Sequence, residues 1–75
     1  MTPTEIIKAF RKVRYNGAAS QMGKRYAKQA LALGDRNPER VAELTAWAEY
    51  RLAIAREWDA RADRLDQTRK EGTKP

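Results

Sequence analysis

Apolar residues recur near the start of the chain at the spacing of an α-helix. Ile6, Phe10 and Val13 fall on one side of a helical wheel, and charged residues occupy the opposite side. Thr2 is a suitable N-cap because its hydroxyl can accept a hydrogen bond from the first helical turn. The pattern predicts a first amphipathic helix over residues 3–14.

Two glycines bound the next apolar repeat. Gly17 or Asn16 can adopt the left-handed conformation that ends the first helix, and Gly34 is the stop signal further along the chain. The apolar residues between them repeat at helical spacing, which predicts a second helix over residues 18–33. Gly23 is expected to be its weak position, because glycine costs about 1 kcal/mol relative to alanine inside a helix.

The rest of the chain favours one long helix. Asn37 is a suitable N-cap, and no glycine or proline occurs between Pro38 and Gly72. Strong helix formers fill this interval, so we expect a helix over residues 38–68 with a length of roughly 45 Å. Residues 68–75 are polar and are expected to form a frayed tail.

A coiled-coil-like stripe runs along the predicted long helix. Small residues at its a positions would let another helix approach closely. Arg51 interrupts the d positions, which suggests a broader apolar face there. We expect an all-α fold, a single domain over residues 1–67, with two short basic amphipathic helices packed on the long C-terminal helix. The a positions are Val41, Ala48, Ala55 and Ala62, and the d positions are Leu44, Arg51, Trp58 and Leu65.

The predicted second helix is too short to cover the third. It is roughly 24 Å long, enough to reach Ile54 if the two helices are antiparallel. An apolar strip left beyond that point is typical of an interface, and a domain this short is near the limit of independent stability. Alternatively, the first helix shifts along and covers Trp58 itself. We expect a homodimer or partner interface formed by Ala55, Trp58, Ala62 and Leu65.

Positive charge is concentrated in the N-terminal half of the chain. The net charge is +6; residues 1–34 carry seven basic side chains and one acidic one, whereas residues 35–75 carry nine of each. This asymmetry indicates an acidic partner, either nucleic acid or an acidic protein surface, although a basic face also serves solubility. The candidate nucleic-acid contacts are Lys8, Arg11, Lys12, Tyr15, Lys24, Arg25 and Lys28.

Residues that commonly carry catalysis or bind metals are scarce. The chain has no cysteine and no histidine, which excludes disulfides, thiolate or imidazole metal ligands and the usual general base near neutral pH. Ser20 is the only serine, and no glycine-rich phosphate loop is present. We therefore expect a non-enzymatic protein with no metal, no cofactor and no small-molecule substrate.

Neither a membrane segment nor a signal peptide is predicted. The longest apolar run, residues 30–33, is far shorter than the roughly 20 residues that span a bilayer. We expect a cytoplasmic protein that does not enter the membrane. Two functions remain open: a small nucleic-acid-binding or regulatory protein, or an adaptor or inhibitor of the bacterial or phage accessory type that docks on a protein through the long helix.

Overall fold

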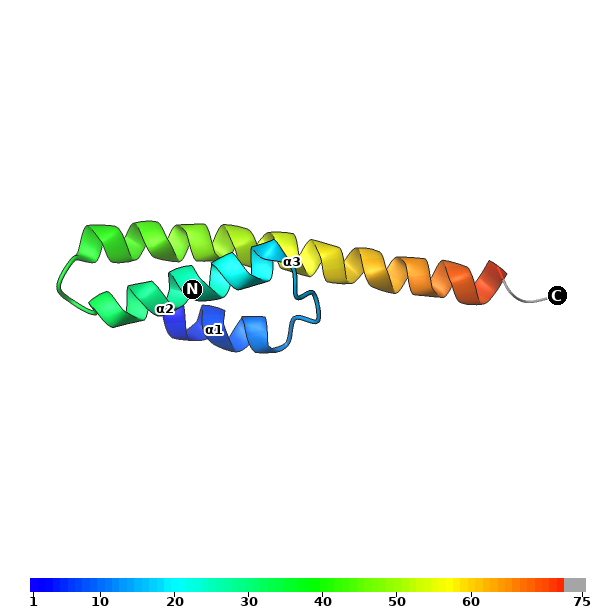
Figure 1. Ribbon diagram of the computed structural model, residues 1–75, viewed down its shortest axis with the longest axis horizontal. Helices are drawn as coiled ribbons and strands as arrows, with labels where there is room; N and C mark the ends of the chain where they lie inside the picture. The colour runs from blue at the N-terminus through cyan, green and yellow to red at the C-terminus, as the bar shows by residue number, and fades with distance from the viewer. Residues whose placement is uncertain (73–75) are drawn as a thin grey trace.

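The computed structural model describes the backbone of residues 1–72 and the side chains of residues 1–67. This part of the chain forms three helices and no strand: α1 (Pro3–Arg11), α2 (Ala18–Leu33) and α3 (Pro38–Gly72). Helices α2 and α3 lie antiparallel, and α1 packs beside α2 at the same end of α3 (Figure 1). The predicted all-α fold with two short helices on one long helix is confirmed.

Helix α1 begins with a reciprocal capping arrangement. The backbone N–H of Glu5 donates to the Thr2 hydroxyl at 3.2 Å, and the backbone N–H of Thr2 donates to the Glu5 carboxylate at 3.2 Å. Hydrogen bonds from the backbone and the side chain of Thr2 lower the pKa of Glu5. The helix ends at Arg11, with Lys12 as its C-cap, and is therefore three residues shorter than predicted.

The two glycines that flank α2 have different roles. Gly34 ends α2 with a positive φ of 55°, as its position predicted. Gly17 does not adopt the left-handed conformation, because it is the N-cap of α2 with φ −90°. A Cβ atom at Gly17 would lie 2.1 Å from the phenol oxygen of Tyr15, so a side chain there would require the Tyr15 ring to shift.

Helix α3 begins at the predicted cap and extends further than predicted. The backbone N–H of Arg40 donates to the side-chain oxygen of Asn37 at 3.1 Å, which confirms Asn37 as the N-cap. The helix continues to Gly72 instead of ending near residue 68. The predicted frayed tail over residues 68–75 therefore falls partly within α3, and residues 73–75 lie outside the described residues.

Small side chains form the contact between α2 and α3. Ala27 of α2 is fully buried together with Ala48 and Ala55 of α3. Because alanine projects little beyond the backbone, the two helices can approach closely. Helix α1 adds the larger buried side chains, Ile6 and Phe10, to the same core.

Gly23 of α2 makes room for the largest of these side chains. A Cβ atom at Gly23 would lie 2.2 Å from the Phe10 ring and 3.0 Å from Cβ of Arg51. The position that sequence analysis identified as a weak point of the helix is therefore required by the packing of all three helices. The low helix propensity of Gly23 is offset by the close packing of the Phe10 ring against it.

The substitution Gly23→Ala should destabilise the fold although it improves helix propensity. We expect the free energy of unfolding to fall by about 1–3 kcal/mol, because the added methyl group displaces the Phe10 ring. Urea unfolding followed by far-UV circular dichroism measures this change. In a double-mutant cycle with Phe10→Leu, the two losses should be less than additive, because the smaller side chain vacates the space. A Gly23→Ala protein as stable as the wild type would contradict this packing.

Helix α3 extends well beyond the other two helices. It has 35 residues against 16 for α2, and the molecule measures 62 × 17 × 15 Å. Figure 1 shows the C-terminal part of α3 continuing past the three-helix bundle. Residues 61–67 are all exposed, so the part of α3 that was expected to project past α2 does so.

Candidate functional site

Asp59 of α3 holds the connection between α1 and α2. Its carboxylate accepts hydrogen bonds from the backbone N–H groups of Arg14, at 3.0 Å, and Tyr15, at 2.8 Å. Arg14 also makes an ion pair with Asp63, and this hydrogen-bonded carboxylate raises the pKa of the Arg14 guanidinium. Because these N–H groups donate to α3, they do not continue the hydrogen-bond ladder of α1, which explains the early end of that helix at Arg11.

Tyr15 occupies a different position from the one predicted. It was expected on the exposed basic side of the first helix as a nucleic-acid contact. Instead it follows α1, packs against the core and stacks on Trp58, with ring centroids 5.6 Å apart and an angle of 13° between the rings. Its carbonyl accepts a hydrogen bond from the buried Ser20 hydroxyl at 2.5 Å. Tyr15 therefore holds the fold together and is removed from the candidate contacts.

The residues of the predicted partner interface have different environments. Ala55 is completely buried in the core, so it has no surface to offer a partner and is removed from the interface. Trp58 is 45% exposed and Leu65 is 65% exposed, while Ala62 lies exposed between them. The connection between α1 and α2 covers part of Trp58 through Tyr15 and reaches Ala62, which lines a hollow together with Arg14 and Tyr15, whereas Leu65 is exposed. Trp58 is therefore covered in part within the monomer, by the connection that follows α1 and not by α1 itself.

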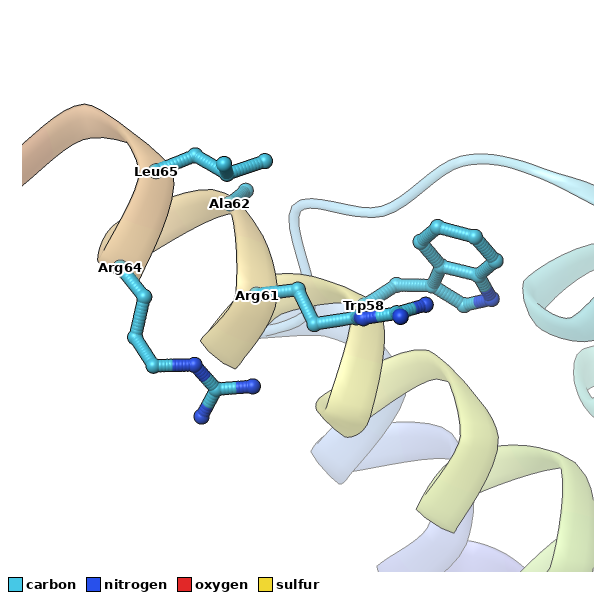
Figure 2. Close-up of a pocket in the computed structure, with 5 residues that line it drawn as sticks. All are labelled: Trp58, Arg61, Ala62, Arg64 and Leu65. Atoms are coloured by element: carbon cyan, nitrogen blue, oxygen red, sulfur yellow. The ribbon is translucent and has the colours of Figure 1, made fainter. Parts of the chain in front are cut away.

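A shallow hollow lies along the projecting part of α3. Trp58, Arg61, Ala62, Arg64 and Leu65 line it, and Figure 2 shows Arg61 alongside the Trp58 indole, with Ala62 and Leu65 further along the helix. The Arg61 guanidinium carbon lies 5.1 Å from the centroid of the Trp58 ring, which is cation–π distance. The hollow therefore combines apolar side chains with two arginines at its rim.

A second hollow on α2 gathers three of the predicted cationic contacts. Lys24, Arg25 and Lys28 line it together with the amides of Gln21 and Gln29. Arg25 and Lys28 are exposed, and Lys24 is partly buried. These side chains offer several hydrogen-bond donors and positive charge within two helical turns.

The cations of α1 are exposed but lie outside that hollow. Lys8, Arg11 and Lys12 come from the last turn of α1 and its C-cap. Basic side chains there interact favourably with the carbonyl groups at the end of the helix. We use the term basic face for the exposed or partly exposed cations of both helices, which are Lys8, Arg11, Lys12, Lys24, Arg25 and Lys28.

The basic face has no acidic side chain paired with it within residues 1–67. The ion pairs described there join the N-terminal ammonium group, Arg14, Arg40 and Arg64 to acids, and none includes a cation of the basic face. Glu5, the only acid among residues 1–34, is held in the capping arrangement of α1. Apart from the electrostatic interaction of Lys8 with Glu5, which helps to lower the pKa of that carboxyl, the positive charge of the two short helices can act on an external anion.

A second group of exposed aromatic residues on α3 was not predicted from the sequence. Trp47 is 48% exposed and Tyr50 is 58% exposed, and their rings meet edge to face with centroids 6.3 Å apart. The Arg51 guanidinium lies 5.7 Å from the Tyr50 ring, and its buried Nε has no partner within the described residues. The spacing was the available signal, since Trp47, Trp58 and Leu65 are 11 and 7 residues apart and share one side of a helix.

Several described acidic side chains of α3 contribute hydrogen bonds and ion pairs to the fold. No group of acidic side chains in the described part of the chain could hold a metal ion. Asp59 accepts backbone N–H groups and Asp63 pairs with Arg14, so both carboxylates serve the fold. No helix within the described residues is long and apolar enough to cross a membrane.

Comparison with known proteins does not assign this chain to a family. No protein-family model, no curated protein and no solved structure matches it. The charge, exposure and spacing of the side chains themselves are therefore the basis for inferring a function.

Loss of the Asp59 carboxylate should release the segment that carries Tyr15. We expect Asp59→Ala to lower the free energy of unfolding by about 1–3 kcal/mol, because two backbone N–H groups lose their acceptor. In a Trp47→Phe background, fluorescence from Trp58 should become more accessible to acrylamide. Asp66→Ala is the matched control, since Asp66 is an exposed carboxylate two turns further along α3. Equal quenching in the two variants would contradict the role assigned to Asp59.

Proposed function

We propose that this protein binds nucleic acid through contacts between its basic face and the phosphate backbone. The observation that carries the proposal is six cations on two adjacent helices, three of them gathered in one hollow on α2, that take part in none of the ion pairs within residues 1–67. A surface with this excess of one charge raises the local concentration of anions and accelerates their association. Nucleic acid offers a regular row of such anions.

Each side chain of the basic face can donate hydrogen bonds to phosphate oxygens. Lysine supplies a mobile ammonium group, and arginine supplies a planar pair of N–H donors that can bind one phosphate at two oxygens. On α2, the Gln21 and Gln29 amides beside Lys24 and Lys28 can donate further hydrogen bonds to phosphate or sugar. Contacts of this kind give affinity and orientation without reading the bases, so we propose binding with little sequence preference.

The salt dependence of binding tests this proposal directly. We expect the purified protein to bind short random-sequence duplexes of DNA or RNA at low salt, measured by fluorescence anisotropy. If all six cations contact phosphates, the logarithm of the association constant should fall against the logarithm of salt concentration with a slope of about −5. Fewer contacts give a proportionally shallower slope. Absence of binding at low salt would contradict the proposal.

Charge reversal on α2 separates a specific face from the net charge of the protein. Lys24→Glu combined with Lys28→Glu should weaken binding at least about tenfold and reduce the magnitude of the salt slope by about 2. The control is Arg40→Glu combined with Arg56→Glu, which changes the net charge equally at two exposed positions of α3. Equal losses of affinity in the two double variants would show that the basic face is not the contact surface.

The projecting part of α3 favours a second candidate function. An adaptor or inhibitor would dock on an acidic protein through Trp58 and Leu65 as apolar anchors, with the basic face steering the encounter. The observation that supports it is the exposed hollow between these residues. This candidate predicts that Leu65→Ser removes capture of the protein partner and leaves affinity for DNA unchanged. The nucleic-acid proposal predicts no loss of function from the same substitution when the protein remains folded.

A further inference from the structure

An apolar stripe follows one side of α3 both within the bundle and beyond it. Residues that are 7, 11 or 18 positions apart on a helix project within about 20° of the same direction around its axis. Ile54, Trp58 and Leu65 stand at these distances from Trp47, and Tyr50 lies one turn beyond Trp47. The large side chains at 47, 50, 58 and 65 are each 45–65% exposed, and Ile54 is partly buried. We call residues 47, 50, 54, 58, 62 and 65 the outer stripe.

We propose that the outer stripe pairs antiparallel with the same stripe of a second copy of this chain, about a two-fold axis level with Arg56. The spacing of the outer stripe is symmetric about that residue. Trp47 then lies level with the partner subunit's Leu65, and Ile54 lies level with the partner subunit's Trp58. Arg56 itself points half a turn away from the stripe and stays outside the contact.

The sizes of the side chains favour this register and this direction. Tyr50 lies level with the partner subunit's Ala62, so a large side chain meets a small one. A parallel pair would set large side chains against each other at 47, 50 and 58 and leave a gap at 62. An antiparallel pair shifted by one turn would set Leu65 against the partner subunit's Glu43 or the partner subunit's Arg51. The register about Arg56 avoids both arrangements.

The length of the outer stripe favours a second copy as its occupant. A stable specific interface buries about 800 Å² on each partner, and the projecting part of α3 offers only Trp58 and Leu65 as large apolar side chains. The whole stripe covers about 27 Å of α3, which is longer than the 16-residue helix α2 that holds the monomer together. A chain whose core consists largely of alanine gains the most from this additional apolar burial.

The pairing is tested by mass in solution, without nucleic acid, so its outcome is independent of the proposed function. Sedimentation equilibrium of the wild type should give the mass of two chains at high concentration and a lower average mass on dilution. Trp47→Glu combined with Leu65→Glu should raise the dissociation constant of the dimer at least about tenfold, because each contact between residue 47 and residue 65 then buries two facing carboxylates of like charge. Ala42→Glu combined with Ala53→Glu is the matched control, with the same change in net charge and two new acids at exposed positions away from the stripe. Helix content by circular dichroism verifies that each variant is folded.

The absence of cysteine allows a clean test of the direction of pairing. Glu57 and Ala46 are exposed and 11 residues apart, so they lie on the same side of α3, next to the stripe. In the proposed pair, the two copies of residue 57 are about 3 Å apart along the helix axis, and the two copies of residue 46 are about 30 Å apart. Oxidation should therefore cross-link the Glu57→Cys protein and leave the Ala46→Cys protein uncross-linked.

Three results would overturn the pairing. The first is a wild-type protein that is monomeric at every concentration, which would leave the outer stripe to a different protein. The second is a dimer that the control double variant weakens as much as the stripe variant does. The third is equally efficient cross-linking at residues 46 and 57, which would show a parallel pair.

Discussion

The close approach of α2 to α3 is the contact on which the rest of the structure depends. Ala27 and Gly23 of α2 meet a row of small residues on α3 that includes Ala48 and Ala55. Since these side chains fill little space, the backbones come together and leave a groove where α1 inserts Phe10. A larger residue at any of these positions would separate α2 from α3 and remove the site where Phe10 of α1 packs.

A core made largely of small side chains determines what remains on the surface. The large apolar side chains of α3 that do not fit the contact lie outside it, at Trp47, Tyr50, Trp58 and Leu65. The cations of α1 and α2 lie on their exposed sides, away from Ile6 and Phe10 of the core. The molecule therefore separates its two candidate surfaces: positive charge on the short helices and an apolar stripe on the long one.

Features set by neighbouring residues were predictable from the sequence. The capping residues Thr2 and Asn37 act within one helical turn, so their residue types suffice to identify them. Gly34 likewise ends α2 through its own backbone freedom. The projection of α3 beyond α2 follows from the relative lengths of the two helices, which the positions of glycine and proline determine.

Features set by contacts between distant residues were not predictable. Asp59 lies 45 residues from Arg14 and 44 from Tyr15, so nothing near residue 12 indicates that α1 ends there or that Tyr15 turns toward Trp58. The single heptad pattern assigned to α3 also did not predict the outer stripe, because α3 carries two apolar faces that lie about a quarter of a turn apart around the helix axis. This pattern assigned Ala55 and Trp58 to one interface, whereas Ala55 faces the core and Trp58 lies largely outside it.

The most direct test of the account is a titration of isotope-labelled protein with a short random-sequence DNA duplex, followed by amide chemical shifts in nuclear magnetic resonance spectra. Because nucleic acid is proposed to bind the short helices, the largest shifts should occur at residues 8–12 of the α1 end and residues 21–29 of α2. Amides of residues 58–65 on α3 should change little. Shifts confined to α3, or no shifts at low salt, would contradict the assignment of the basic face as the nucleic-acid-binding surface.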